Sequence, residues 1–413
     1  MSNEPARPTS EDEEGLAEPV VPSGEEAASE LSPADPFFVS KQAAAVLKHG
    51  ILSRYIVPFT MKVGSTAENK RVVYIDGYAG AGIYNDGTKG SPALILKTAV
   101  EMSDKRTLEC LFIEKNKDHF ERLSGLVAEH KKNGVATDAL RGEVHQRLPA
   151  FLERAKSAPL LCFLDPFGLG IPFSDIVHIF ETRSASQIPT EVILNFSANA
   201  IRRIGPFASK AHPTTGEQKT LARVDTACGG DWWRKVYCDA ADKDKAVEQI
   251  AYGFMQRLAK AISGGGFAIQ VQKKPSHKPV YYLVFITKNY VGLDVFTQAV
   301  SSAQEDWRKH VYMDGKKPSD ETALITDEDL FKQQEDTLAK GWIEEIHQNI
   351  TQRLAKGAFL VRNEIPAVYG EALGLARDKH VRAAVKQLHD EGVTNCDGKG
   401  AVSKFYIDRK TTP

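Results

Sequence analysis

The chain has 413 residues, 42% hydrophobic and 26% charged, so it can bury one large core with a small domain beside it. No apolar run approaches the roughly 20 residues that cross a bilayer, and the N-terminus lacks a basic patch followed by an apolar stretch. We therefore expect a cytoplasmic protein. The five cysteines have neither CxxC spacing nor a histidine cluster nearby, so we expect no disulfide framework and no metal site.

The N-terminal segment differs in composition from the rest of the chain. Residues 1–35 are rich in Glu, Pro, Ser and Ala and carry ten acidic residues against Arg7 alone. Such a composition buries too little apolar surface to offset chain entropy, which predicts a disordered acidic tail over residues 1–36. The segment has a net charge of −9 and the whole chain −1, so the remainder carries +8. A mildly basic body permits binding to a polyanion without requiring it.

Residues 37–322 alternate short apolar runs with amphipathic stretches, the pattern of strand and helix units that build a largely parallel sheet. Apolar residues at helical spacing first predict a helix from near Ser40 to Pro58. Strands are then predicted over 72–75, 110–113, 160–164 and 191–195, helices over 91–102, 117–133 and 173–180, and a closing hairpin over 267–272 and 281–287. The expected fold class is α/β, a Rossmann-like sheet with helices on both faces.

Two further segments are predicted outside this alternation. Residues 198–250 are expected to form an insertion with basic residues, Arg202 and Arg203 among them, and with adjacent tryptophans that pack it onto the core. Residues 325–413 predict three helices, the third over 377–389, and a terminal hairpin that turns at 397–400. This order of helices and wing is typical of a small winged-helix module.

A glycine-rich turn directly after a predicted strand is the strongest chemical signal. The sequence is Tyr74-Ile75-Asp76-Gly77-Tyr78-Ala79-Gly80-Ala81-Gly82. Glycines allow the backbone to approach a ligand closely, and an acid at the strand end can bind an amino group or order water. A dinucleotide fingerprint has a third glycine where this chain has Asn85, which argues against NAD.

Carboxylates follow the next two strands. Glu114 ends the second predicted strand, where a Rossmann fold binds the two ribose hydroxyls and a carboxylate can accept both hydrogen bonds. Glu143 follows Gly142 after a further strand and is a candidate acceptor for an adenine amino group. With Asp76, Tyr78, Ala79, Gly80 and Gly82, these acids form a candidate site for S-adenosylmethionine.

The candidate catalytic motif follows the strand at 160–164. Asp165 and the Pro166 carbonyl are suited to accept hydrogens of an amine, and Phe167 offers a face for a stacked base ahead of Gly168. A sulfonium methyl donor is already activated, so such a site must mainly hold the acceptor nitrogen in line with the methyl group.

These motifs carry two resemblances. The tetrad at 165–168 resembles the motif of tRNA guanine-N2 dimethyltransferases and is similar to the Asp-Pro-Pro-aromatic motif of amino-directed DNA methyltransferases. Over about residues 40–310 the order of motifs resembles the three-Cys-motif partner protein family. Those motifs are Lys48-His49-Gly50-Ile51-Leu52, 74–82, Gly90-Ser91-Pro92, 112–115, 164–168, Asn195-Phe196 and Tyr281-Tyr282-Leu283. The resemblance implies a Rossmann-like methyltransferase fold and a neighbouring partner protein with a three-cysteine motif.

The last predicted helix is basic. Arg377, Lys379, Arg382 and Lys386 are opposed only by Asp378, so this helix is a candidate to bind a major groove or RNA phosphates, although a solvated face on a protein-docking module is an equal alternative.

The leading hypothesis is an S-adenosylmethionine-dependent N-methyltransferase that acts on an exocyclic amine of a nucleic-acid base. The residues leave RNA, DNA and protein open as acceptors. A catalytically silent adaptor that uses the methyltransferase fold as a scaffold for a partner protein is the second hypothesis. A nucleotide-dependent oxidoreductase is the third, and Asn85 disfavours it.

Overall fold

The computed structural model describes residues 36–85, 87–166, 168–183, 188–314, 316 and 326–410. Residues 1–35, over which the acidic tail is predicted, lie outside the described residues, and Pro36 begins the first described helix. Among the described residues no helix combines the length and the apolar character that a bilayer span requires.

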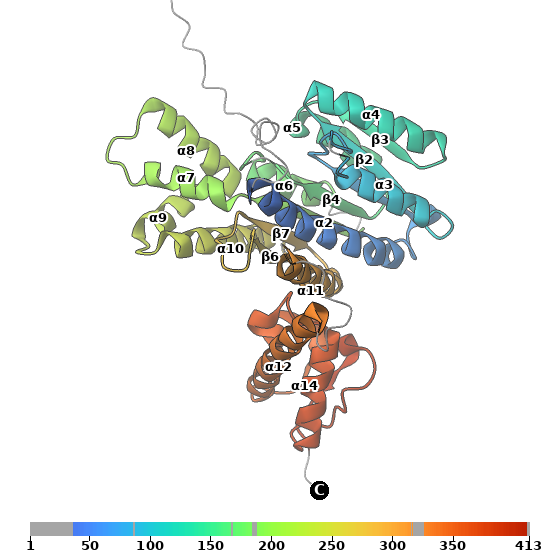
Figure 1. The fold of residues 1–413 in the computed structure, drawn as a ribbon, viewed down its shortest axis with the longest axis vertical. Helices are drawn as coiled ribbons and strands as arrows, with labels where there is room; N and C mark the ends of the chain where they lie inside the picture. Colours follow the sequence, from blue (N-terminus) through green and yellow to red (C-terminus); the bar gives the residue numbers. More distant parts are fainter. Residues whose placement is uncertain are drawn as a thin grey trace, which may run out of the picture. The chain divides into compact units, whose positions relative to one another are not determined.

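A seven-stranded mixed sheet is the centre of the fold (Figure 1). Its strands are β1 (Arg71–Asp76), β2 (Thr107–Glu114), β3 (Thr137–Arg141), β4 (Leu160–Leu164), β5 (Thr190–Phe196), β6 (Gly265–Val271) and β7 (Tyr281–Thr287). They are ordered β3-β2-β1-β4-β5-β7-β6. The first five are parallel, whereas β7 runs antiparallel to both β5 and β6. The predicted strands and closing hairpin are therefore confirmed.

Helices cover both faces of the sheet, because successive strand residues point to opposite sides. In β1, Val73 and Ile75 belong to one apolar cluster, and Val72 and Tyr74 to the other. The first cluster is completed by α5 (Val144–Arg154), α6 (Phe173–Glu181), α7 (Ala198–Ala208), α8 (Thr215–Cys228), α9 (Trp232–Asp239) and α10 (Lys243–Ala261). The second is completed by α2 (Pro36–Val63), α3 (Ser91–Glu101), α4 (Lys117–Lys132) and α11 (Tyr290–Met313). The α/β prediction is confirmed.

The C-terminal end of helix α2 lies later in the chain than the sequence predicts. The helix was expected to end near Pro58, but it continues to Val63. A proline removes a helical hydrogen bond and favours a break. Here Ile56 and Phe59, on either side of Pro58, are almost fully buried in the second cluster, so packing keeps the last turns helical.

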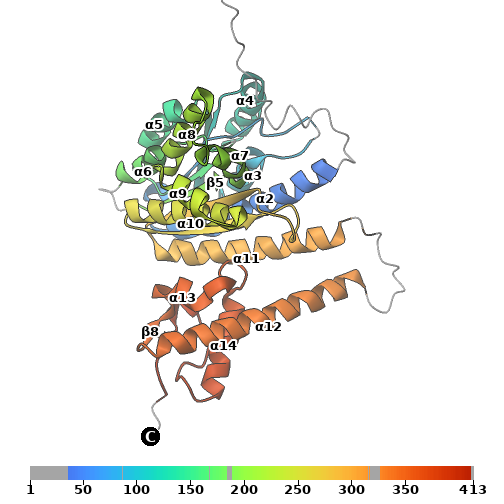
Figure 2. The ribbon, with the colours of Figure 1, turned by 90° about the vertical axis from the view of Figure 1, so that its left-hand side faces the viewer.

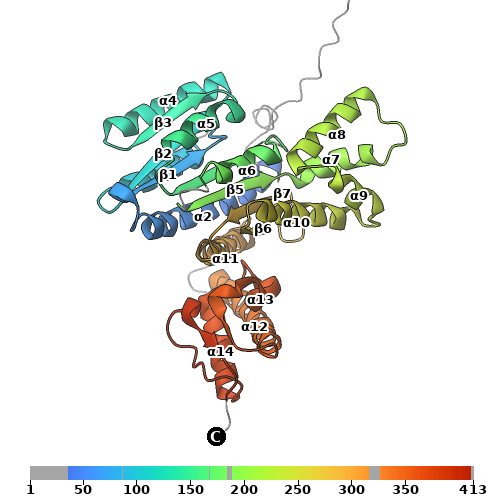
Figure 3. The ribbon, with the colours of Figure 1, turned by 180° about the vertical axis from the view of Figure 1, so that it is seen from behind.

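Among its described residues the segment at 198–250 contains α7, α8, α9 and the start of α10 and no strand, and in the sequence it falls between β5 and β6. The four helices lie together on the right in Figure 3. Trp233 is fully buried in the first cluster, and its indole donates to Asp225 at 2.9 Å. Trp232 stacks with the guanidinium of Arg257 at 4.3 Å. The predicted packing of this segment through its tryptophans is thus confirmed.

The C-terminal segment has its own core. Its elements are α12 (Asp327–Leu354), β8 (Phe359–Leu360), α13 (Ile365–Tyr369), α14 (Asp378–Asp390) and β9 (Tyr406–Ile407), and α12 and α14 lie side by side (Figure 2). Ile350, Val381 and Leu388 are among the residues that form a third apolar cluster. Gln298 of α11 donates to the Tyr369 hydroxyl at 3.0 Å, and Arg308 binds Glu335 at 2.6 and 2.7 Å. These bonds join α11 to the C-terminal elements.

The predicted terminal hairpin is only partly correct. Strand β9 pairs with β8 and not with the segment just before the turn at 397–400, which makes one bridge between Thr394 and Arg409. Val402 and Phe405 are buried in the third cluster, so this stretch forms a 3₁₀ turn directed at the core instead of an alternating strand.

Candidate functional site

The strand order marks one edge of the sheet as the place for a ligand. Strands β1, β2 and β3 follow one another in one direction, and β4 and β5 lie on the other side of β1, so the order reverses between β1 and β4. Open α/β sheets bind ligands outside the carboxyl ends of the strands at this point. Asp76 ends β1, Glu114 ends β2 and Asp165 directly follows β4. The predicted acids therefore lie along the same edge.

The glycine-rich turn after β1 is tied to both neighbouring strands. The Gly77 amide donates to the Phe163 carbonyl at 2.9 Å, and the Ala79 amide donates to the Ile113 carbonyl at 3.0 Å. Gly80 and Gly82 have φ of +66° and +76°, a region that favours glycine. A Cβ on Gly82 would also lie 2.8 Å from Leu126. The positive φ therefore favours glycine at 82, and the end of the Leu126 side chain would have to move to admit a Cβ.

Asp76 is enclosed beneath this turn. Its side chain has no exposed surface, and its carboxylate accepts from the Ser91 hydroxyl at 2.6 Å and from the Tyr78 amide at 3.1 Å. Burial raises the pKa of Asp76 to about 6, although the hydrogen bonds from Ser91 and Tyr78 oppose the shift. In this arrangement Asp76 shapes the turn, and the role predicted for it, to bind the donor's amino group or to order water, stays a prediction.

Glu114 is held against the same turn. One carboxylate oxygen accepts from the Gly80 amide at 2.8 Å, and the other accepts from the Asn116 amide at 2.7 Å. A carboxylate oxygen can accept two hydrogen bonds, so each oxygen keeps one acceptor position that no described residue fills. The side chain is 9% exposed. Glu114 is thereby fixed in position and can still bind a pair of hydroxyl groups.

Glu143 lies beside Glu114 but is solvated. It is the N-cap residue of α5, and its carboxylate pairs with Lys115 at 3.7 Å with half of its side chain exposed. The Gly142 amide donates to the Glu114 carbonyl at 3.1 Å, which links the two acids through the backbone. The adenine contact predicted for Glu143 stays a prediction.

Asp165 is bound on both sides. Its Oδ2 accepts from the Lys48 ammonium of α2, and its Oδ1 accepts from the Asn195 amide at 2.8 Å. Burial alone would raise the pKa of Asp165, but Lys48 and the hydrogen bonds outweigh burial and lower it. Pro166 and Gly168 continue the turn, and Phe167 lies outside the described residues. Asp165 is therefore an ionised carboxylate at neutral pH.

Lys48, Asn195 and Tyr281 are the site residues to which sequence reasoning gave no role. They occurred only inside motifs of the family resemblance. Lys48 and Asp165 are 117 residues apart in the sequence, yet they form an ion pair with side chains 20% and 18% exposed. The charges of Lys48 and Asp165 also act on Tyr281, whose pKa is raised mainly by burial. The sequence signal for Lys48 was a lysine inside an apolar helical stretch. Helix periodicity alone does not show that this lysine contacts the end of a distant strand.

The predicted nucleic-acid residues divide into two groups. Arg202 binds Asp244 at 2.9 Å and the Pro279 carbonyl at 2.6 Å, Arg377 pairs with Glu305 of α11, and Arg382 donates to the Gly400 carbonyl at 3.0 Å. These arginines hold the structure together. Arg203, Lys379 and Lys386 are exposed and form no ion pair with any described residue. The second group has no acidic partner among the described residues, and phosphate binding by either group stays a prediction.

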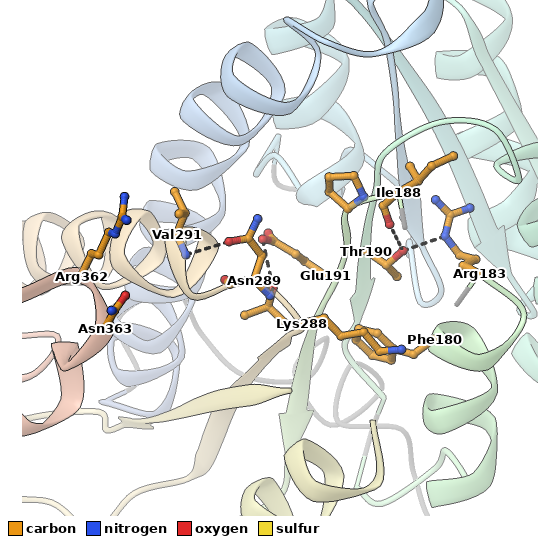
Figure 4. Close-up of a pocket in the computed structure, with 12 residues that line it drawn as sticks. Phe180, Arg183, Ile188, Thr190, Glu191, Lys288, Asn289, Val291, Arg362 and Asn363 are labelled. Atoms are coloured by element: carbon orange, nitrogen blue, oxygen red, sulfur yellow. Dashed lines mark hydrogen bonds between the residues drawn. The ribbon is translucent and has the colours of Figure 1, made fainter. Parts of the chain in front are cut away.

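A cavity of about 510 Å³ lies at the opposite edge of the sheet, where β5 begins and β7 ends (Figure 4). Its buried groups already have partners. Arg183 donates to Thr190 at 2.8 Å and to the Ala155 carbonyl at 2.6 Å, and Glu191 accepts from the Tyr55 hydroxyl. Within the described part of the chain no cluster of His, Cys, Asp or Glu could hold a metal ion. The cavity is therefore separate from the predicted site.

The chain matches no known protein-family model, and no curated protein matches it in sequence. Some solved structures are similar to it over part of their length. The plantazolicin methyltransferase BamL in complex with a desmethylPZN analog and SAH is 10% identical, with 61% of this chain and 89% of that chain covered and a TM-score of 0.31. TYW2 of P. horikoshii in complex with MeSAdo is 10% identical, with 56% and 61% covered and a TM-score of 0.25. An rRNA methylase from Streptococcus thermophilus is 10% identical, with 57% and 96% covered and a TM-score of 0.25.

Proposed function

We propose that the chain is an S-adenosylmethionine-dependent methyltransferase whose donor site is the carboxyl edge of β1 and β2. The observation that carries this proposal is the fixed position of Glu114 against the Gly80 amide, with one acceptor position on each carboxylate oxygen that no residue in the described ranges fills. A ribose diol supplies two matching donors. The reversed strand β7 between β5 and β6 also departs from the dinucleotide-binding order, which disfavours the oxidoreductase alternative.

The residues of this edge fit the parts of the donor. Gly80 and Gly82 have no side chain of their own and hold the turn in a positive-φ conformation next to Glu114, and Tyr78 and Ala79 lie between Asp76 and these glycines. Glu143, the N-cap residue of α5, is the proposed acceptor for the adenine amino group. When bound, S-adenosylmethionine supplies an activated methyl group. The chain's own task is then to hold an acceptor next to Asp165, one strand away from the glycine turn.

A nucleic acid is the proposed class of acceptor. The body outside the acidic N-terminal segment carries +8, and Lys379 and Lys386 are exposed on α14. The order α12, β8, α13, α14 and β9, with a loop before β9, supports the interpretation of a winged-helix module that holds such a substrate. The tetrad at 165–168 favours an exocyclic amine of a base as the acceptor group by resemblance.

Membership of the three-Cys-motif partner family is proposed with the same site. Lys48, Asp165, Asn195 and Tyr281, which come from separate motifs of that resemblance, meet at one edge of the sheet. A partner protein with a three-cysteine motif follows from this proposal. The alternative function is a silent adaptor for that partner, which the enclosed Asp76 and the internal pairing of Asp165 favour.

A methyl-transfer assay separates the enzyme from the adaptor. Purified protein is incubated with S-adenosylmethionine that carries a labelled methyl group and with total cellular nucleic acid. The enzyme transfers label to nucleic acid, and Asp165→Ala abolishes the transfer. Asp104→Ala is the matched control because Asp104 is exposed in the loop that leads into β2. Equal transfer by wild type and Asp165→Ala would contradict the role of Asp165, and no transfer by any form would favour the adaptor.

A further inference from the structure

The ammonium of Lys48 lies at the proposed acceptor side of the site, and we propose that it selects a hydroxyl group as the methyl acceptor in place of an exocyclic amine. This inference rests on the proposed methyltransferase function. It adds a catalytic residue and names the acceptor class, and it replaces the amine predicted from the motif at 165–168.

Lys48 contacts Asp165, and its charge also reaches residues of the glycine turn. Its ammonium pairs with Asp165 Oδ2, and its charge also acts on Asp76, beneath the turn, and on Tyr84. The Tyr84 hydroxyl would lie 3.0 Å from a Cβ on Gly80, so Tyr84 covers that glycine. Lys48 therefore stands where the donor turn and the Asp165 motif approach each other.

Lys48, Asp165 and Asn195 form a cluster whose polar atoms have further hydrogen-bonding capacity toward a ligand. An ammonium has three N–H donors, and Lys48 makes one hydrogen bond to a described residue, the one to Asp165. The Asn195 Oδ1 atom is buried and accepts no hydrogen bond within the described part of the chain. On the Asp165 carboxylate, Lys48 and Asn195 fill one acceptor position each, so among the described residues one position on each oxygen has no donor. The cluster thus offers strong donors and strong acceptors to one ligand group.

A hydroxyl group fits this combination better than an amine does. A hydroxyl oxygen accepts from Lys48 while its hydrogen is donated to Asp165. The nitrogen of an exocyclic amine on a base has a delocalised lone pair, so it donates hydrogens but is a poor acceptor for an ammonium. The amine nitrogen also gains positive charge on methylation, which a neighbouring ammonium disfavours, whereas a hydroxyl oxygen gains negative charge as its proton leaves.

The step balances with the groups at hand. The hydroxyl oxygen forms a bond to the methyl carbon while the bond from that carbon to the sulfonium sulfur breaks, and sulfur keeps the electron pair. The hydroxyl proton passes to the Asp165 carboxylate. Lys48 stabilises the negative charge that develops on the oxygen, and it stays protonated because its ion pair with Asp165 raises its pKa despite burial. In a nucleic acid the hydroxyl within the chain is the ribose 2′-hydroxyl, which RNA has and DNA lacks.

The test compares RNA with DNA and Lys48→Met with Lys62→Met. Lys62 is the matched control because it lies on the same helix and is exposed. Labelled S-adenosylmethionine is offered with total RNA or genomic DNA from cells that do not encode the chain, and the products are digested to nucleosides and analysed by mass spectrometry. We expect ribose O-methylation of RNA and none of DNA. We expect Lys48→Met to lose on the order of 100-fold in rate, as when one donor to a developing oxyanion is removed.

Binding and pH measurements separate this inference from the function on which it rests. Calorimetry with S-adenosylmethionine should give equal donor affinity for wild type and Lys48→Met, which also shows that the variant folds. The acid limb of the rate profile should move to higher pH in Lys48→Met, because Asp165 loses the cation that keeps it ionised. Label on a base nitrogen, or an undiminished rate in Lys48→Met, overturns the inference, as does donor binding without any RNA product. Absence of donor binding by wild type overturns the proposed function itself.

Discussion

The ion pair between Lys48 and Asp165 predicts a measurable coupling in stability. Asp165→Asn keeps the shape of the side chain and removes its charge, so it leaves the Lys48 ammonium without its partner. Removing one partner of a fully buried pair costs about 3–5 kcal/mol. Because the Lys48 and Asp165 side chains are 20% and 18% exposed, we expect a smaller loss in the free energy of unfolding, roughly 2 kcal/mol.

A double-mutant cycle at pH 7 measures this coupling by urea unfolding. Lys48→Met alone should cost about 1 kcal/mol, since Asp165 keeps its bond from Asn195. The double variant should be more stable than the sum of the two losses predicts, by at least about 1 kcal/mol. If the two losses add to within about 0.3 kcal/mol, Lys48 and Asp165 do not interact, and the acceptor side of the site is wrongly described.

Three further predictions concern other parts of the chain. Burial raises the pKa of Glu191 from 4.5 to about 7, so the stability that its protonated form provides is complete below pH 4.5 and is lost as the pH rises through 7. Between pH 5 and 8 the free energy of unfolding of Glu191→Gln should therefore rise relative to that of wild type, by roughly 3 kcal/mol at most. Thermal melts measure this change, and an equal pH dependence of the two proteins would contradict it. Gly82→Ala should abolish donor binding and lower the melting temperature more than Gly134→Ala, which has a similar φ of +83° and open space around it. Lys379→Ala with Lys386→Ala should reduce the salt dependence of RNA affinity by about one to two ions, and an unchanged slope would exclude α14 from the interface.

The sheet could be predicted from sequence because its signals are local. The buried strands β1, β4 and β5 appear as short apolar runs, and Asp76, Glu114 and Asp165 each stand at or directly after a strand end. Carboxyl ends of neighbouring parallel strands share one edge, so the acids could be placed together before any coordinates were known.

The remaining features depend on contacts that sequence periodicity does not encode. The Ser91 and Tyr78 hydrogen bonds that enclose Asp76 arise from the path of a loop, and Lys48 reaches Asp165 only because α2 packs across the sheet. Arg202 and Arg377 appeared to be surface cations, but each has an acidic partner on a distant element. Charge composition identifies basic residues, but it does not distinguish a residue in a structural ion pair from one that is available to bind a ligand.

The central claim is that the edge beside Glu114 binds the methyl donor, and titration calorimetry tests it most directly. Wild type should bind S-adenosylmethionine and its demethylated product, and Glu114→Gln should weaken both by about 10- to 100-fold, as expected for lost hydrogen bonds to a charged group. Glu153→Gln is the matched control, because Glu153 is an exposed acid on α5. No binding of either compound by wild type, or equal binding by Glu114→Gln, would contradict the account.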